Sequence, residues 1–259
     1  MDSLAVYWLC VFVLFLVGVS IGSFMNVYVY RAPKMLLEED YPHTLSKPNS
    51  FCPHCNSAIH WKYLLPVIGY LLSKRECTQC HKSISIHYPL VELAYGIIPV
   101  LNYFIFGWSI DFVVVTVLLF SVYPIVAIDF KHHLLLDTTT YPLLWIALLL
   151  SALNFSMVSP SMAIIGALAG YLFLSIPIYS FKLLRGFDGM GMGDAKLMGA
   201  MGAFFGWQAI PFIMIIASIF GIAIYLFEVK RSGNKNPYFA FGPAIILAVL
   251  LYELKLIMV

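Results

Sequence analysis

The sequence predicts an all-α polytopic membrane protein with about eight transmembrane helices and a small cytoplasmic domain between the first two. Hydrophobic residues make up 61% of the 259 residues and charged residues only 11%, whereas soluble domains are about half apolar and about a quarter charged. This composition excludes an ordinary soluble enzyme. Eight apolar segments are candidates to cross ~30 Å of hydrocarbon. They are Leu4–Tyr30, Pro89–Phe106, Phe112–Ile128, Thr138–Phe155, Ser161–Leu184, Asp194–Phe205, Gln208–Val229 and Ala240–Ile257.

The first segment, Leu4–Tyr30, resembles a secretory signal only in its apolarity. Met1-Asp2-Ser3 carries no basic residue, and the basic residues follow the apolar run instead of preceding it. A signal peptide has the opposite arrangement. We therefore expect this segment to be a retained transmembrane helix.

The segment Asp194–Phe205 is the shortest of the eight. It is separate from the next one only because of the turn expected at Gly206-Trp207. Without that turn the two would form one span, so six to eight spans are compatible with the sequence. We prefer eight.

Basic residues predict the orientation, because Lys and Arg near the ends of spans stay in the cytoplasm. With eight spans they fall on one side of the membrane, leaving only Lys255 near the other. The amino terminus is then outside. The residues of the cytoplasmic side are Arg31, Lys34, Lys47, Lys62, Lys74, Arg75, Lys82, Lys131, Lys182, Arg185, Lys230, Arg231 and Lys235.

Residues 31–88 form the one hydrophilic stretch that is long enough to be a domain. Its prolines argue against long helices, and a unit of this size buries little core without a covalent or metal link. The sequence thus divides into a first transmembrane helix (1–30), a cytoplasmic domain (31–88) and a transmembrane core (89–259). The prolines are Pro33, Pro42, Pro48, Pro53 and Pro66.

Four cysteines in the hydrophilic domain indicate a metal site. Cys52 and Cys55 form one C-x-x-C pair, and Cys77 and Cys80 form a second. This spacing is typical of a closed, structural zinc site with four thiolate ligands. Disulfides are the alternative, but a cytoplasmic domain is in a reducing compartment. A redox pair is less favoured, because no thioredoxin-like pattern accompanies it. Such a site has no open coordination position, so catalysis must lie elsewhere.

Two acidic residues mark the candidate catalytic centre. Asp129 ends one apolar run, where the helix dipole favours the protonated acid, and Asp194 begins another, where amide donors favour the carboxylate. An aspartic protease needs one carboxylate to take a proton from water and one protonated partner to polarise the peptide carbonyl. The predicted topology places both residues on the same side of the membrane at similar depth.

Structural roles are the alternative for both acids. Asp194 could be a helix cap, Asp129 a solvated loop residue, and the glycines of Gly189–Gly193 a site of close packing. On these residues alone the two interpretations carry similar weight. Asp137 is expected to cap the following helix, and Glu92 is expected to pair with a basic loop residue.

Several motifs together resemble the type IV prepilin peptidases, and they cover nearly the whole chain in order. They are Gly22-Ser-Phe-Met-Asn-Val-Tyr-Val-Tyr-Arg31-Ala-Pro33, the paired C-x-x-C motifs, Ile128-Asp129-Phe-Lys-His-His-Leu-Leu-Leu-Asp137, Gly191-Met-Gly-Asp194-Ala-Lys196-Leu197 and Phe241-Gly-Pro243. One departure is visible: the family usually has proline before the acid that ends the first aspartate motif, where this chain has Leu136.

The resemblance implies a membrane-embedded aspartic endopeptidase of the GxGD type in the bacterial inner membrane. Its substrates would be type IV prepilins or pseudopilins, cut at the cytoplasmic face after the basic leader. Asp129 and Asp194 would be catalytic. Many members also methylate the new amino terminus with S-adenosylmethionine, and the family associates the cysteine domain with zinc and methyl transfer. Gly191 and Gly193 are expected to contact the substrate, because glycine lets a peptide backbone approach closely. Lys196 is expected to point toward lipid headgroups or toward the substrate.

Two other classes of function remain open. A proton-coupled transporter also uses acids in apolar segments, although transporters tend to place them near the midplane in repeated halves. A zinc-stapled scaffold without chemistry would tolerate loss of both acids. Besides prepilins, we expect membrane lipid as a partner and no nucleic acid.

Overall fold

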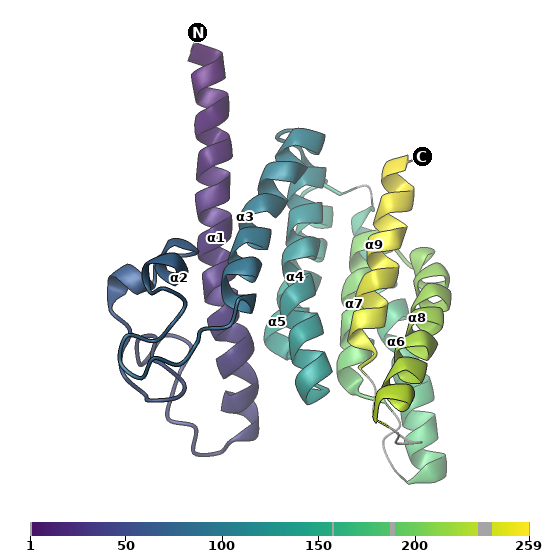
Figure 1. Ribbon diagram of the computed structural model, residues 1–259. Helices are drawn as coiled ribbons and strands as arrows, with labels where there is room; N and C mark the ends of the chain where they lie inside the picture. Colours follow the sequence, from purple (N-terminus) through teal and green to yellow (C-terminus); the bar gives the residue numbers. More distant parts are fainter. Residues whose placement is uncertain (1, 157, 187–189, 233–239, 259) are drawn as a thin grey trace. The chain divides into compact units, whose positions relative to one another are not determined.

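The computed structural model describes residues 2–156, 158–186, 190–232 and 240–258 (Figure 1). Gly189 and Lys235, which the sequence analysis named, lie outside these ranges. The regular elements among the described residues are all helices, with two isolated bridges and no strand, so the all-α prediction is confirmed. The helices are α1 (Asp2–Leu37), α2 (Ile68–Leu72), α3 (His87–Phe106), α4 (Ile110–His132), α5 (Asp137–Ala152), α6 (Pro160–Arg185), α7 (Met192–Phe205), α8 (Ala209–Ser232) and α9 (Gly242–Met258), with a 3₁₀ turn, η1, at Trp61–Tyr63.

Each of the eight predicted segments corresponds to a helix, and η1 and α2 are additional. Among the described residues, five helices are long and apolar enough to cross a membrane, namely α1, α3, α4, α6 and α8. The helices α5, α7 and α9 have 16, 14 and 17 residues. The number of eight spans stays a prediction. The chain folds as two compact units, Met1–Phe120 and Ser121–Val259.

In the first unit, α1 packs against α3 through small residues. A Cβ at Gly18 would lie 2.2 Å from the carbonyl oxygen of Tyr95, and one at Gly22 would lie 2.9 Å from the Cα of Glu92. Side chains at these positions would force the helices apart, so glycine lets the two backbones touch. These contacts define the register between the two helices, with Gly18 level with Tyr95 and Gly22 level with Glu92.

The helix α1 is longer than predicted. It continues through Pro33 to Leu37, although we expected proline to prevent helix in this region. A proline inside a helix removes one backbone hydrogen bond. Contacts of the buried Arg31 support this part of α1, because its guanidinium donates to the carbonyl oxygens of Thr44 and Pro48 at 2.8 and 3.0 Å.

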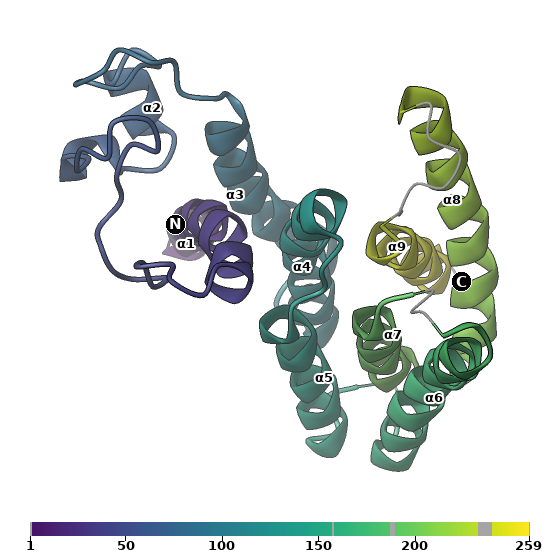
Figure 2. The ribbon, with the colours of Figure 1, turned by 90° about the horizontal axis from the view of Figure 1, so that it is seen from below.

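In the second unit, α7 lies between α5, α6 and α9, and it also contacts α8 (Figure 2). Its contact with α6 is made by bare backbone: a Cβ at Gly166 would lie 2.0 Å from the oxygen of Gly202, and a Cβ at Gly202 would lie 2.1 Å from the oxygen of Gly166. Neighbouring helices therefore cover α7 closely. This cover explains how a helix of only 14 residues, ~21 Å long, is accommodated within the unit.

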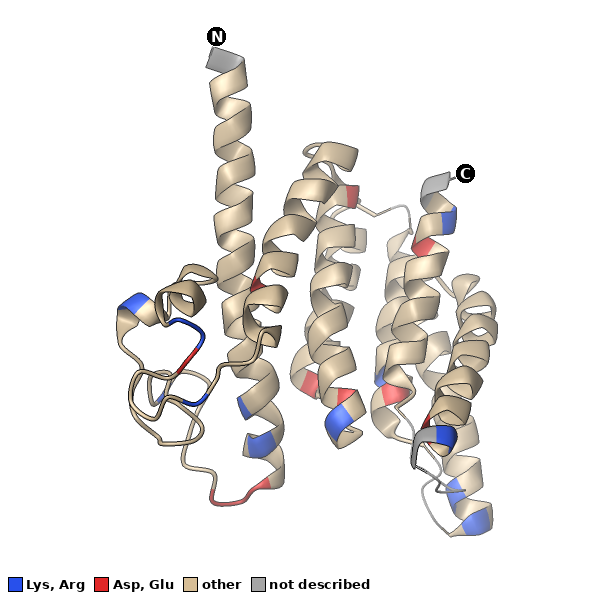
Figure 3. Ribbon diagram, in the orientation of Figure 1, with Lys and Arg blue, Asp and Glu red and all other residues tan. Residues whose placement is uncertain are grey.

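Charged residues within the second unit lie near the ends of its helices, and the middle of the unit is apolar (Figure 3). Asp129 and Asp194 both belong to this set of helix ends. The acidic residues of this unit therefore lie at the ends of its helices and not in their middle.

Candidate active site and metal centre

Asp129 lies in the last turn of α4 and is buried, with 5% of its surface exposed. Its Oδ2 accepts a hydrogen bond from the backbone N–H of Gly242 at 2.9 Å. Gly242 is the first residue of α9, so the free amide at a helix amino terminus meets the carboxyl group. The sequence analysis gave Gly242 no such role, although it noted the motif Phe241-Gly-Pro243.

Asp194 is the third residue of α7 and is also buried, with 7% of its surface exposed. The cap position of this helix is Gly191, which has no side chain to bond the free amides. Among the described residues, Asp194 Oδ1 has no hydrogen-bond partner. We expected amide donors at Asp194, but its Oδ1 has none in the described part of the chain, and an amide donor binds Asp129 instead.

The loop after α4 connects the surroundings of the two acids. Leu135 of this loop lies against Gly193, because a Cβ at Gly193 would come within 2.6 Å of the Leu135 Cβ. The same side chain lies against Gly242, where a Cβ would be 3.0 Å from Leu135 Cδ2. One leucine thus contacts both the residue before Asp194 and the residue that bonds Asp129. The two carboxyl groups are near enough for their charges to interact.

Lys196 is held by residues of α5. Its Nζ lies 2.6 Å from Asp137 Oδ1 and 5.3 Å from the centre of the Tyr141 ring. The sequence had suggested that Asp137 caps α5, and this prediction is wrong. The cap residue is Leu136, and Asp137 is the first residue of the helix. An acid at this position still favours the positive end of the helix dipole, and here it also fixes the ammonium group of Lys196.

Leu136 occupies the position where the family usually has proline. Its φ of −77° lies within the range that a proline ring imposes, about −65 ± 15°. The backbone of this chain therefore takes the conformation of the missing proline. The entry into α5 therefore uses a φ that proline would also adopt.

The four cysteines Cys52, Cys55, Cys77 and Cys80 form the cluster that the spacing predicted. Their sulfur atoms all lie within 4.8 Å of one another. The Cys52–Cys80 and Cys55–Cys77 sulfur distances are 3.8 and 3.9 Å. Tetrahedral zinc with bonds of ~2.3 Å requires sulfur atoms ~3.8 Å apart, so the cluster has the size of a zinc site.

Two nearly identical loops carry the cysteines. In the first, Cys52 accepts from the N–H of Asn56 and donates its own N–H to Ser57; in the second, Cys77 does the same with His81 and Lys82, all at 2.9–3.0 Å. Asn56 and His81 both have positive φ, 54° and 55°. We call these loops the two knuckles. Their backbones repeat each other, which the sequence analysis had not recognised beyond the shared C-x-x-C.

The second knuckle also prepares its first sulfur for a cation. Backbone N–H groups of Cys80 and Gln79 point at the Cys77 thiol and lower its pKa to about 6. The thiolate is the form that binds metal. The loop thus favours the thiolate at Cys77, whereas burial and the neighbouring thiols raise the pKa of Cys80 in the same knuckle to about 11.

Comparison with known proteins assigns the family. The Bacterial Peptidase A24 N-terminal domain matches residues 16–106, and the Type IV leader peptidase family matches residues 112–226. The chain belongs to the type IV leader peptidase family. No solved structure was found to match it.

Several curated relatives of this leader peptidase are named prepilin leader peptidase/N-methyltransferase. The one from Aeromonas hydrophila is 36% identical and covers 93% of this chain and 89% of its own length. That from Klebsiella pneumoniae is 39% identical, covering 79% and 89%. That from Neisseria gonorrhoeae is 36% identical, covering 88% and 84%. The similarity extends over both units of the chain.

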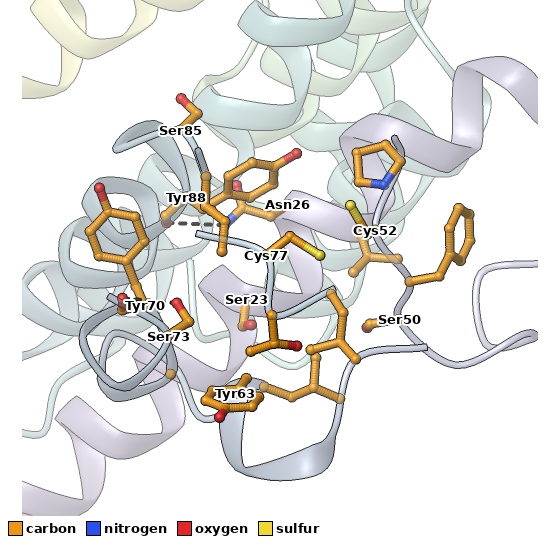
Figure 4. A pocket seen from close by; sticks show the side chains of 18 of the residues that line it. Ser23, Asn26, Ser50, Cys52, Tyr63, Tyr70, Ser73, Cys77, Ser85 and Tyr88 are labelled. Carbon is orange, nitrogen blue, oxygen red and sulfur yellow. Dashed lines mark hydrogen bonds between the residues drawn. The ribbon is translucent and has the colours of Figure 1, made fainter. Parts of the chain in front are cut away.

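The first unit of the leader peptidase also contains a cavity of about 390 Å³, shown in Figure 4. Its wall combines α1, the two knuckles, the segment between them and the start of α3. Asn26 lies at its side, with the amide donating to the carbonyl oxygen of Tyr88 at 3.1 Å. Hydroxyl groups, tyrosine rings and two knuckle cysteines complete the lining that Figure 4 labels: Ser23, Ser50, Cys52, Tyr63, Tyr70, Ser73, Cys77, Ser85 and Tyr88.

Proposed function

We propose that this chain is an inner-membrane aspartic endopeptidase that removes the basic leader of type IV prepilins or pseudopilins and then methylates the new amino terminus. The observation that carries the proposal is the pair Asp129 and Asp194: both are buried, both lie at helix ends, and Leu135 contacts the surroundings of both. Both also lie in the segment that matches the Type IV leader peptidase family.

The proposed peptidase reaction uses the two carboxyl groups together. One takes a proton from a water molecule as that water attacks the scissile carbonyl carbon, and the other, protonated, donates a hydrogen bond to the carbonyl oxygen. The Gly242 N–H holds one oxygen of Asp129 in place. Burial keeps bulk water from the pair, which strengthens both interactions.

Gly191 is the best placed of the three expected substrate contacts. It is exposed, and a Cβ there would meet nothing nearer than Asp194 Oδ2, at 3.7 Å. A peptide backbone can therefore approach the carboxyl group over this residue. Gly193 is instead covered by Leu135, and Lys196 is bonded to Asp137. Their proposed contribution is to position Asp194, with Lys196 also available to a substrate group beside Asp137.

Zinc is the metal proposed for the cysteine cluster. Four sulfur ligands at tetrahedral spacing leave no position for water or substrate, so its role is to hold the two knuckles together. Cys52 and Cys77 also line the cavity of the first unit. Loss of the metal would therefore deform the wall of the cavity.

We propose the same cavity as the site of the methyl donor. Its volume lies in the range of small-molecule sites, and its wall offers both rings for a base and polar groups for an amino acid moiety. When bound, S-adenosylmethionine supplies an electrophilic methyl group to the new amine. Asn26 and the surrounding hydroxyls would orient the donor. Calorimetry with S-adenosylhomocysteine tests this: Asn26→Leu should weaken binding, and Gln208→Leu at an exposed position of the second unit should leave it unchanged.

The decisive experiment for the peptidase uses the full-length protein in lipid nanodiscs with a prepilin and labelled S-adenosylmethionine. Asp129→Asn and Asp194→Asn should each abolish leader removal while the protein still accumulates. Asp111→Asn is the matched control, since this exposed acid lies in the first turn of α4. Normal processing by either of the first two variants would refute the aspartic mechanism.

A further inference from the structure

The segment that joins the two knuckles exposes an unusual amount of apolar surface. We call Trp61–Leu72, which contains η1 and α2, the linking hairpin. It forms part of the hydrophilic stretch of the sequence, yet its large apolar side chains are not packed inside the unit. Trp61 is 69% exposed and Leu71 62%, and the other exposed members are Leu64, Leu65, Ile68 and Leu72. So many exposed apolar side chains in one short segment indicate a contact surface.

The tip of the linking hairpin is fixed to α3. Glu92 of α3 is buried, and its Oε2 accepts a hydrogen bond from the Val67 N–H at 2.7 Å. Glu92 was expected to pair with a basic loop residue, and the structure gives it this backbone amide. Val67 has a φ of 61°, which is unfavourable for a β-branched residue. A strained residue held by a buried acid indicates that the position of the tip matters.

The height of Glu92 places the hairpin at membrane depth. The helix α3 has 20 residues and a length of ~30 Å, just enough to cross the hydrocarbon. Its first residue, His87, must therefore lie near the hydrocarbon boundary. Glu92 is five residues further along, or ~7 Å deeper. The Val67 amide bonded to it lies at the same depth.

The pairing with α1 gives the same depth independently. The Cα of Glu92 is level with Gly22, which precedes the first basic residue of α1, Arg31, by nine residues or ~13 Å. In Figure 1, α2 is level with the lower part of α3 and above the loops of the knuckles. The hairpin thus lies further from the basic end of α1 than the knuckles do.

The backbone of the hairpin suits an apolar environment. The amides of Ile68, Gly69 and Leu71 donate to Pro66, Leu65 and Val67. The Val67 amide is satisfied by Glu92. Non-helical backbone is tolerated at membrane depth only where it is buried in protein or lines a water-filled cavity, and the hairpin meets this condition because Tyr63, Gly69 and Tyr70 line the cavity of the first unit.

Basic residues flank the apolar surface. Lys62 follows Trp61, and Lys74 and Arg75 follow Leu72. All three are exposed. A tryptophan beside cations is typical of the bilayer interface, and anionic lipid headgroups attract such cations.

We propose that the linking hairpin is a re-entrant element inserted into the leaflet on the side of the knuckles. The partner of its apolar surface is lipid. Acyl chains cover Trp61, Ile68, Leu71 and Leu72, and anionic headgroups bind the flanking basic residues. Glu92 clips the inserted tip to α3. The depth of ~7 Å agrees with that of amphipathic interfacial helices, ~5–10 Å. The proposal rests on unit 1 alone and is independent of prepilin cleavage.

The test uses the full-length protein in vesicles of phosphatidylcholine and phosphatidylglycerol. The other tryptophans, Trp8, Trp108, Trp145 and Trp207, are replaced by phenylalanine so that only Trp61 emits. Lipids brominated near the headgroup end of the acyl chain should quench Trp61 several-fold more than aqueous iodide does. As a control, His54→Trp in a background without other tryptophans places the probe in the first knuckle, where iodide should quench and brominated lipid should not.

A second comparison separates insertion from folding. Leu71→Gln with Leu72→Gln should reduce quenching of Trp61 by brominated lipid several-fold. The matched pair is Leu36→Gln with Leu37→Gln, which lie exposed at the end of α1 beyond Arg31 and should change nothing. Metal content, measured for all variants, verifies that the knuckles have formed. Iodide-accessible Trp61 in the unmodified hairpin, or equal effects of the two leucine pairs, would overturn the proposal.

Discussion

The backbone N–H of Gly242 donates to Asp129 Oδ2 at 2.9 Å, joining residues that are 113 positions apart in the chain. The contact brings the start of the last helix to the end of α4. It also places glycine directly against the carboxyl group, since a Cβ at Gly242 would lie 2.7 Å from the same oxygen. The backbone of Gly242 thus positions the carboxyl group of Asp129.

Gly242→Ala should impair catalysis more than stability. The added methyl group meets the ends of two side chains, Asp129 and Leu135, which can rotate away, so the fold should persist. A displacement of the carboxyl group by ~1 Å costs on the order of 10²-fold in rate. We expect such a fall in kcat for leader removal with only a small change in Tm. Wild-type kcat would contradict the positioning role of Gly242.

The two glycines of the GxGD motif should differ in their response to alanine. At Gly193 a Cβ would lie 2.6 Å from the Leu135 Cβ and 3.2 Å from its carbonyl oxygen. Gly193→Ala should therefore destabilise the protein by about 1–3 kcal/mol, as overpacking does. Gly191→Ala has room and an ordinary φ of −73°, so its Tm should match that of the wild type.

Kinetics then isolate the role of Gly191. If substrate backbone passes over this residue, Gly191→Ala should lower kcat/KM for prepilin although the fold is intact. An unchanged kcat/KM would show that the substrate takes another path to Asp194.

Removal of one knuckle cysteine should remove the metal. Cys77→Ser leaves three thiolates of the closed site, and we expect zinc measured by atomic absorption to fall from a single ion per chain to near zero. Methyl transfer should fall at least as much as leader cleavage, because Cys77 also lines the cavity. Cys10→Ser is the control, since Cys10 lies in α1 far along the chain from the cluster. Absence of zinc from the wild type would contradict the site.

The pair Asp137 and Lys196 distinguishes a structural contact from a substrate contact. Both side chains are partly exposed, and such ion pairs contribute only ~0–1 kcal/mol. Asp137→Asn and Lys196→Gln should therefore lower the free energy of unfolding only slightly and to a similar extent. If Lys196 also binds substrate, Lys196→Gln alone should raise KM. Equal kinetic effects of both variants would restrict Lys196 to its contact with Asp137.

Much of the architecture follows from the sequence, because transmembrane helices are determined by local composition. The eight apolar runs became eight helices with ends displaced by a few residues, and the C-x-x-C spacing predicted the sulfur cluster. The predicted end of α1 was wrong. Proline weakens a helix locally, but the tertiary contacts of Arg31 can support the helix beyond this point.

The contacts between distant segments did not follow from the sequence. Neither the Gly242 amide on Asp129 nor the two contacts of Leu135 has a local signal, because a backbone N–H is the same in every residue. The depth of the linking hairpin was equally hidden, since it depends on the register between α1 and α3. Composition therefore identifies the catalytic candidates, and helix packing decides what surrounds them.

The hydrogen bond between Asp129 and Gly242 has a consequence for the synthesis and membrane insertion of the protein. During synthesis Asp129 leaves the ribosome 113 residues before Gly242, so the chain must extend as far as α9 before this aspartate has its donor. A nascent or truncated chain that lacks α9 inserts most of its helices with an incomplete centre. If Asp129 is catalytic as proposed, proteolytic competence would then arise only after α9 is in place, when the other helices already surround the site.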